Sequence, residues 1–188
     1  TQSHDQLLKL LLDIGAPIYC EALSQISDHP SISKLQIRGG EQILGLGLIK
    51  GWWSSVIRLG GVPTTRFWRD LESKFFQIPV LNITNEIWPG LSRNCTTIQM
   101  SNLTTPNGYQ TSFYPCEATE WKDTDQFLVD NKIQLLKDLP LSEQNIAFSL
   151  NKVIPKNSFV YLGNSLPIRF WDNYSSPQST AKNLTVGG

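Results

Sequence analysis

The chain has 188 residues, with 16 lysines and arginines and 16 aspartates and glutamates, so its formal net charge is zero. Because it lacks a strong positive field, we expect neither nucleic acid nor an anionic membrane as a partner. The longest apolar stretches, residues 7–12 and 43–49, are far shorter than the roughly 20 residues that a membrane span needs. We therefore predict a cytoplasmic globular protein without a membrane span.

The first half of the chain alternates between helical and extended patterns. Helical spacing of apolar residues is followed by short apolar runs, and glycine or proline lies at the boundaries. Such alternation predicts parallel βαβ units. The stretch 43–49 is apolar but interrupted by glycines, and both a helix and a loop stay open for it. The expected elements are a helix at 4–15, strands at 16–20, 54–59 and 78–83, and a helix at 65–76.

The pattern fades after residue 84, where turn signals surround one β-prone segment at 95–100, and it returns in the second half. Helices are expected at 123–137 and 142–153, and a strand at 159–162. The second helix begins with a partial capping box, in which Ser142 is followed by Asn145 rather than glutamate. The fold predicted is α/β. A domain boundary between about residues 116 and 141 fits these shifts.

The first candidate site follows the strand at 54–59, where Gly60 and Gly61 lead into Thr64, Thr65 and Arg66. In open α/β sheets, ligands bind beyond the carboxyl ends of the strands, where helix N-termini attract anions. The threonines can cap the helix or donate to a ligand, and Arg66 can grip a carboxylate with two hydrogen bonds. The structural alternative is a threonine-capped helix with Arg66 in solvent.

The second candidate site follows the strand at 159–162, where Gly163 leads into Asn164 and Ser165, with Arg169 beyond. If a helix begins here, Ser165 and Arg169 lie one turn apart on the same face. A hydroxyl and a guanidinium on one face suit an anionic substrate. The structural alternative is again a capped helix with a surface arginine.

The remaining reactive residues give weaker signals. The three cysteines are widely spaced and predict reduced thiols rather than disulfides or a metal site. His4 and His29 lie in polar segments, where solvent exposure is the expected state. Asn-x-Ser/Thr sequons would suit a secreted glycoprotein, although no signal-peptide pattern accompanies them. They begin at Asn82, Asn94, Asn102, Asn173 and Asn183.

Four segments, in the same order along the chain, resemble the MenD family of 2-succinyl-5-enolpyruvyl-6-hydroxy-3-cyclohexene-1-carboxylate synthases. Residues 162–169, Leu-Gly-Asn-Ser-Leu-Pro-Ile-Arg, resemble the family's Gly-Asn-Ser-x-Pro-x-Arg motif. Residues 57–66 look like its Arg-Phe-Gly-x-x-Pro-Thr-Ser-Lys pattern, with Arg66 in place of the lysine. Residues 16–24 are similar to its Trp-Pro-Val-Leu-Ala-Asp/Glu-x-Leu-Ser segment, and 88–93 to a further central-domain stretch.

The resemblance implies a synthase that depends on thiamine diphosphate (ThDP) and Mg²⁺ and joins decarboxylated 2-oxoglutarate to isochorismate, as a homodimer or homotetramer. The resemblance also implies a Rossmann-like central domain with a parallel sheet at 1–115, a linker at 116–140, and the first elements of the α/β ThDP-binding domain at 141–188. Asn164 and Ser165 would bind the cofactor and, with Arg169, the substrate carboxylate or the ThDP-linked intermediate. Thr64, Thr65 and Arg66 would bind substrate on the isochorismate side.

The chain also departs from the family pattern. The resemblance places the ThDP-activating glutamate in an N-terminal domain and the Mg²⁺ motif beyond residue 188, so we expect an inactive fragment with no metal site. At residues 183–188, Leu184 stands where the family has a substrate-binding arginine. The alternative function is a non-catalytic ligand-binding or structural/regulatory central domain of a diverged ThDP-enzyme homologue. A ligand-binding domain of this kind would bind aryl carboxylates through Arg58 or Arg66.

Overall fold

The computed structural model describes residues 2–24, 26–27, 29–88, 90–92, 95–99, 119–155, 158–163, 165–175 and 182–185. Their α-helices are α1 (Gln2–Ile14), α2 (Glu41–Lys50), α3 (Arg66–Ser73), α4 (Glu120–Asp138), α5 (Glu143–Val153) and α6 (Leu166–Tyr174). Their strands are β1 (Val56–Leu59), β2 (Val80–Ile83), β3 (Thr96–Ile98), β4 (Phe159–Leu162) and β5 (Lys182–Thr185). Two short 3-10 helices, η1 (Ala22–Ser24) and η2 (Pro30–Ile32), follow α1.

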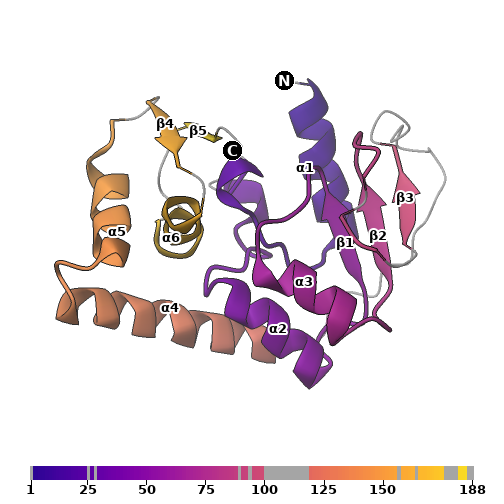
Figure 1. Ribbon diagram of the computed structural model, residues 1–188, viewed down its shortest axis with the longest axis horizontal. Helices are drawn as coiled ribbons and strands as arrows, with labels where there is room; N and C mark the ends of the chain where they lie inside the picture. Colours follow the sequence, from indigo (N-terminus) through magenta and orange to yellow (C-terminus); the bar gives the residue numbers. More distant parts are fainter. Residues whose placement is uncertain are drawn as a thin grey trace.

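The predicted parallel sheet is confirmed. Strands β1, β2 and β3 lie side by side in that order, with Val56 of β1 opposite Val80 of β2 and Leu81 opposite Thr96 of β3, all parallel. Helix α3 makes the crossover between β1 and β2, as a βαβ unit requires. A second parallel pair, β4 and β5, lies in the other half of the molecule (Figure 1). The architecture is α/β, consistent with a Rossmann-like domain.

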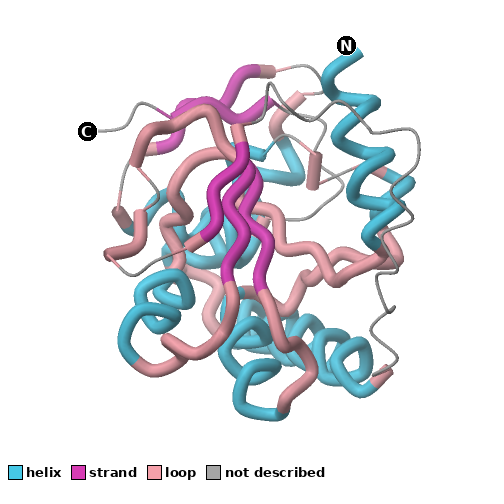
Figure 2. Tube along the Cα trace, turned by 90° about the vertical axis from the view of Figure 1, so that its right-hand side faces the viewer, coloured by secondary structure: helices cyan, strands magenta, loops and turns pink. Residues whose placement is uncertain are grey.

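Both faces of the first sheet are covered, because successive side chains of a strand point to opposite faces. Val56 packs into a core cluster that Leu48 of α2 and Leu71 of α3 help to form. Leu59 packs on a separate cluster around Leu8 and Leu11 of α1. Figure 2 shows the three strands side by side, with the N-terminal helix to one side and other helices below. Strand β1 is thereby packed against α2 and α3 through Val56 and against α1 through Leu59.

The stretch at 43–49, for which the sequence left helix and loop open, lies within helix α2. One of its two glycines, Gly47, is explained by the ring of Trp53, which packs directly on the helix. A Cβ atom at Gly47 would lie 1.9 Å from Cζ2 of Trp53, whereas one at Gly45 would meet nothing within 4 Å. Gly47 is therefore required by close packing, and Gly51 ends the helix in the left-handed conformation with φ of 71°.

The strand predicted at 16–20 is wrong in extent. Only Ile18 pairs, through a single parallel bridge to Gln36. Its N–H donates to Leu35 O at 2.7 Å, and its carbonyl accepts from Ile37 N at 2.8 Å. Pro17 has no N–H to extend the ladder, so the segment passes on as irregular backbone.

Helix α4 lies in the predicted linker and joins the two halves of the molecule (Figure 1). Asp125 of α4 is 7% exposed, and its Oδ1 accepts from Gly39 N at 2.6 Å. Arg38 N donates to Oδ1 at 3.1 Å and to Oδ2 at 3.0 Å. Farther along the helix, Lys132 Nζ donates to Asn173 O of α6 at 3.2 Å. The domain boundaries themselves stay a prediction.

Two features bear on the glycoprotein alternative. Asn82, the first sequon residue, is fully buried in β2, so no glycan can be attached there in this fold. Cys20 and Cys95 are free thiols, as predicted, and Cys116 lies outside the described residues.

In the part of the chain that the structure describes, no helix combines the length and apolar character needed to cross a membrane.

Candidate functional site

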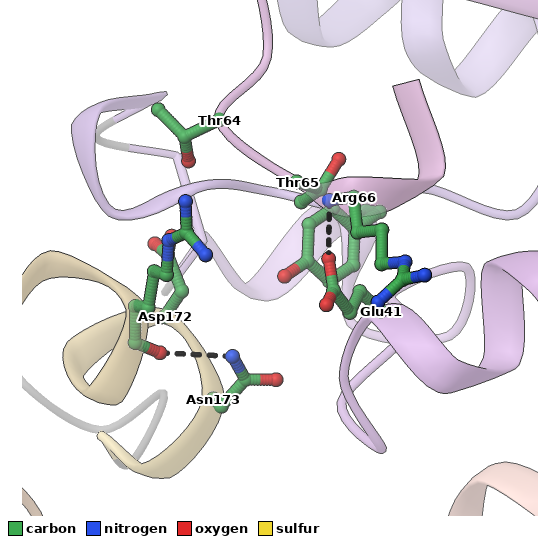
Figure 3. Close-up of a pocket in the computed structure, with 8 residues that line it drawn as sticks. Glu41, Thr64, Thr65, Arg66, Asp172 and Asn173 are labelled. Carbon is green, nitrogen blue, oxygen red and sulfur yellow. Dashed lines mark hydrogen bonds between the residues drawn. The ribbon is translucent and has the colours of Figure 1, made fainter. Parts of the chain in front are cut away.

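The two strand-end junctions that the sequence singled out meet at one small, partly open pocket. Thr64, Thr65 and Arg66 approach it from the start of α3, and Arg169 approaches it from α6. Figure 3 shows the N-terminal end of α3 facing α6 across this space. The pocket lining is completed by Tyr19, Glu41, Asp172 and Asn173.

The N-terminus of α3 is not capped by a threonine side chain. Thr65 is the N-cap residue, yet its hydroxyl makes no capping hydrogen bond. Instead Glu21 Oε1 accepts from Thr64 N at 2.7 Å and from Thr64 Oγ1 at 3.2 Å. Glu41 Oε2 accepts from Arg66 N at 2.8 Å. Two carboxylates from distant segments thus occupy N–H groups that the sequence assigned to a ligand.

The α6 side of the pocket is fixed by a third carboxylate. The segment forms a helix, as the second junction required, and Asp172 lies three residues after Arg169. The Asp172 carboxylate accepts from Ala22 N of η1, across 150 positions of sequence. Asn173 Nδ2 donates to Arg169 O at 2.8 Å within the helix (Figure 3). The turn of α6 that bears Arg169 is therefore tied to the segment that bears Glu21.

Burial perturbs the acidic groups around the pocket. Desolvation raises the pKa of Asp172 from 3.8 to about 7, with the Ala22 N–H opposing and Glu21 and Glu41 adding to the rise. Desolvation also raises the pKa of Glu21, against the hydrogen bonds from Thr64. The pKa of Tyr19 is raised well above its usual value by burial and by the neighbouring carboxylates. Asp172 is therefore partly protonated near neutral pH.

Sequence reasoning missed these carboxylates, because their partners lie far away along the chain. Glu21 alone carried a signal, since residues 16–24 resemble a family segment with an acidic residue at that place. Glu41 and Asp172 lie in helices whose local pattern indicates nothing beyond a helix. Only the folded chain brings them beside Arg66 and Arg169.

The pocket can bind an anion through its two arginines. Both Arg66 and Arg169 are exposed, so their guanidinium groups can meet a ligand from solvent. Arginine presents a planar fork of donors that matches a carboxylate. Three carboxyl groups lie close by, so the site has a mixed rather than a purely cationic character. Such a mixture favours a ligand whose carboxylates fit between fixed donors over a simple inorganic anion.

Of the other predicted residues, only Ser165 can be compared with this pocket, and it does not line it. Ser165 is the exposed N-cap of α6, with φ of 72° and no capping bond from its side chain, and it is not among the lining residues. Asn164 lies outside the described residues. Leu184 pairs with Tyr161 across β4 and β5, and its side chain is outside the described part. Their roles stay predictions.

Arg58, the other arginine considered for aryl carboxylates, lies in the core. It is 4% exposed, and its guanidinium lies over the ring of Trp68, 5.4 Å from the centroid. Burial lowers its pKa, with Glu86 opposing that effect. It does not line the pocket, so Arg66 is the better placed of the two for a ligand there.

The described residues were also compared with what ThDP and Mg²⁺ need. No group of three histidine, cysteine, aspartate or glutamate side chains in the described ranges is arranged to hold a metal ion. Of the two residues predicted to bind the cofactor, only Ser165 is described, and its hydroxyl lies outside the pocket lining. The ThDP and Mg²⁺ dependence stays a prediction, and we derive no step through either group.

Comparison with known proteins gives the family. No protein-family model matches the chain. The chain is 34% identical over 194 residues to a 2-succinyl-5-enolpyruvyl-6-hydroxy-3-cyclohexene-1-carboxylate synthase of Bdellovibrio bacteriovorus, a match that covers 100% of this chain and 36% of the relative. Synthases of the same name from Akkermansia muciniphila and Leuconostoc citreum are 29% and 26% identical, over 69% and 95% of this chain.

The chain spans only part of these relatives, namely 36%, 24% and 31% of their lengths. The match to the Bdellovibrio synthase nevertheless includes every residue of the pocket, because it runs over the whole chain. Over the segment that it spans, the chain belongs to the MenD family of 2-succinyl-5-enolpyruvyl-6-hydroxy-3-cyclohexene-1-carboxylate synthases.

Proposed function

We propose that this chain forms the substrate-binding middle portion of a synthase that joins decarboxylated 2-oxoglutarate to isochorismate in menaquinone or phylloquinone biosynthesis. The relatives' name supports the reaction class. The observation that carries the proposal is that Arg66 and Arg169, from separate halves of the chain, both line one pocket. Both substrates are dicarboxylates, so a pocket with two exposed guanidinium groups is chemically suited to them.

In this proposal the chain's own residues bind and orient. Arg169 grips a substrate carboxylate from α6, and Arg66 reaches the isochorismate side from α3. Glu21 and Glu41 hold the α3 N-terminus in place, so that Arg66 stays pre-oriented and loses less freedom on binding. ThDP and Mg²⁺ enter the proposal on family resemblance alone. ThDP would supply the carbanion chemistry that decarboxylation of a 2-oxo acid requires. We also propose that these 188 residues alone do not turn over substrate.

The test is substitution of Arg169 in the full-length protein. One lost charge-assisted hydrogen bond costs about 1.5–3 kcal/mol, so Arg169→Ala should lower kcat/KM by about tenfold to a hundredfold. Arg169→Lys should fall between Ala and the wild type, because charge remains while the paired hydrogen bonds are lost. The matched control is Arg69→Ala, which removes an exposed arginine of α3 that does not line the pocket. Unchanged kinetics in Arg169→Ala would remove Arg169 from the proposal.

A second function is favoured by one observation. Glu21 and Glu41 already accept the N–H groups of Thr64 and Arg66, so these donors at the start of α3 are satisfied without any ligand. That state also suits a non-catalytic regulatory site that takes an aryl carboxylate through Arg66. Titration with 1,4-dihydroxy-2-naphthoate separates the two functions. Binding that Arg66→Ala abolishes, with synthase kinetics in the absence of that ligand unaltered, would favour regulation.

A further inference from the structure

Two consecutive residues connect the pocket's arginine-bearing segments. Glu21 accepts hydrogen bonds from N and Oγ1 of Thr64, which lies two residues before Arg66. The next residue, Ala22, donates its N–H to Asp172 of α6. The route from one arginine to the other therefore passes through two carboxylates and a single peptide unit.

We propose that Glu21 and Asp172 form a carboxylate relay that sets the position of Arg169 relative to Arg66, which makes Asp172 a positioning residue for the anionic substrate. The inference rests on the proposed function, since it concerns the same pocket. Asp172 acts through the orientation of α6, and its carboxylate is already engaged by Ala22 N.

Apolar packing alone would not fix this orientation. Ile168 and Trp171 of α6 pack with Ala22 and Leu162 in one core cluster. Such contacts hold the helix near η1, but the hydrophobic effect has no direction, and a helix can roll on an apolar surface. Arg169 and Asp172 lie three residues apart and therefore on the same face of α6, so a roll of the helix would move both side chains together. A directional hydrogen bond from the next turn prevents that roll.

The charged neighbours of Asp172 indicate which substitutions at this position should keep the hydrogen bond from Ala22 N. Glu21 and Glu41 face it from the 19–24 segment and α2, Tyr19 lies beside them, and the two arginines share the lining. Burial among these groups raises the pKa of Asp172 to about 7, so the neutral carboxyl is a common state. An asparagine has the shape of that neutral form and keeps an acceptor oxygen for Ala22 N. The relay should therefore survive Asp172→Asn and fail in Asp172→Ala.

The experiment uses the full-length protein with Asp172→Ala, Asp172→Asn and, at the other link, Glu21→Ala. The control is Asp130→Ala, which removes an exposed acid of α4 that does not line the pocket. KM and kcat are measured for both substrates, the Kd of 2-oxoglutarate by calorimetry, and amide hydrogen exchange at Ala22. Denaturant midpoints show which variants are folded, and Glu21→Ala gives a second break in the relay if Asp172→Ala does not fold.

We expect KM and Kd to rise about tenfold in Asp172→Ala and Glu21→Ala, which corresponds to about 1.4 kcal/mol, with kcat changed less than KM. Asp172→Asn should stay within about threefold of the wild type, in line with the modest difference between acceptors. Ala22 should lose protection from exchange in Asp172→Ala only. Two results in folded Asp172→Ala would overturn the inference. One is a wild-type KM although the Ala22 amide has lost its protection from exchange, and the other is full protection of that amide.

The same measurements separate this inference from the proposed function. If the wild type binds 2-oxoglutarate but shows no synthase turnover, the proposed reaction fails, and the relay is still decided by the Kd values. If turnover is present and Asp172→Ala changes neither KM nor Kd, the relay fails while the reaction stands. A wild type that neither binds nor reacts overturns both.

Discussion

Removal of the Asp125 carboxylate should detach α4 from the sheet domain. This side chain accepts Gly39 N at 2.6 Å and Arg38 N at 3.0 Å and 3.1 Å, in a buried place where water cannot replace it. Position 39 has no room for a side chain, because a Cβ there would lie 2.7 Å from Asp125 Oδ1. The loop and the helix are therefore complementary at this one point.

The magnitude follows from the two N–H groups that Asp125→Ala leaves without a partner. A buried unsatisfied donor costs about 1–3 kcal/mol. Gly39 is buried and should cost near the upper end of that range, whereas Arg38 is exposed and its N–H should cost near the lower end. The sum is about 3–4 kcal/mol, a large part of the roughly 5–15 kcal/mol by which a domain is stable.

The assay is urea unfolding of this chain, followed by tryptophan fluorescence. Trp121 of α4 is buried beside Ile43 and is one of the six tryptophans that contribute to the signal. Asp130→Ala, on the exposed face of the same helix, is the control and should shift stability by less than about 0.5 kcal/mol. A loss below about 1 kcal/mol in Asp125→Ala, with an unchanged m-value, would refute the reasoning.

Three further predictions concern individual residues. Gly47→Ala should destabilise the chain by about 1–3 kcal/mol through overlap with Trp53. Gly45→Ala in the same helix should stabilise it by about 0.5–1 kcal/mol, and thermal melts measure the opposite shifts in melting temperature. Ser142→Ala should cost about 1 kcal/mol through loss of the α5 cap, measured by urea unfolding. Burial lowers the pKa of Lys132 from 10.5 to about 8, so the free energy of unfolding should rise between those pH values, and Lys132→Met should flatten that slope.

The sheet and the later helices were predictable because their signals are local. The apolar run of β1 with its glycine stop, and the spacing in α3 and α5, specify each element within a few neighbouring residues. The predicted helix at 123–137 is confirmed and begins a few residues earlier, at Glu120.

The rest depends on contacts between distant residues. Glycines in α2 read as loop signals until Trp53, which packs on the helix, is in place. The strand at 16–20 fails because a partner is available for Ile18 alone. The sequence predicted four of the pocket's lining residues, since Thr64–Arg66 and Arg169 follow strands. It missed the capping role of Glu21, whose partner Thr64 lies 43 positions away.

The most direct test of the shared pocket is a double-mutant cycle on Arg66 and Arg169 in the full-length synthase. If both guanidinium groups hold the same bound substrate, kcat/KM for isochorismate and 2-oxoglutarate should fall in each Ala variant. The double variant should then depart from the product of the single effects by about tenfold or more. Single effects that multiply without coupling, or wild-type kinetics in either variant, would contradict a substrate site between α3 and α6.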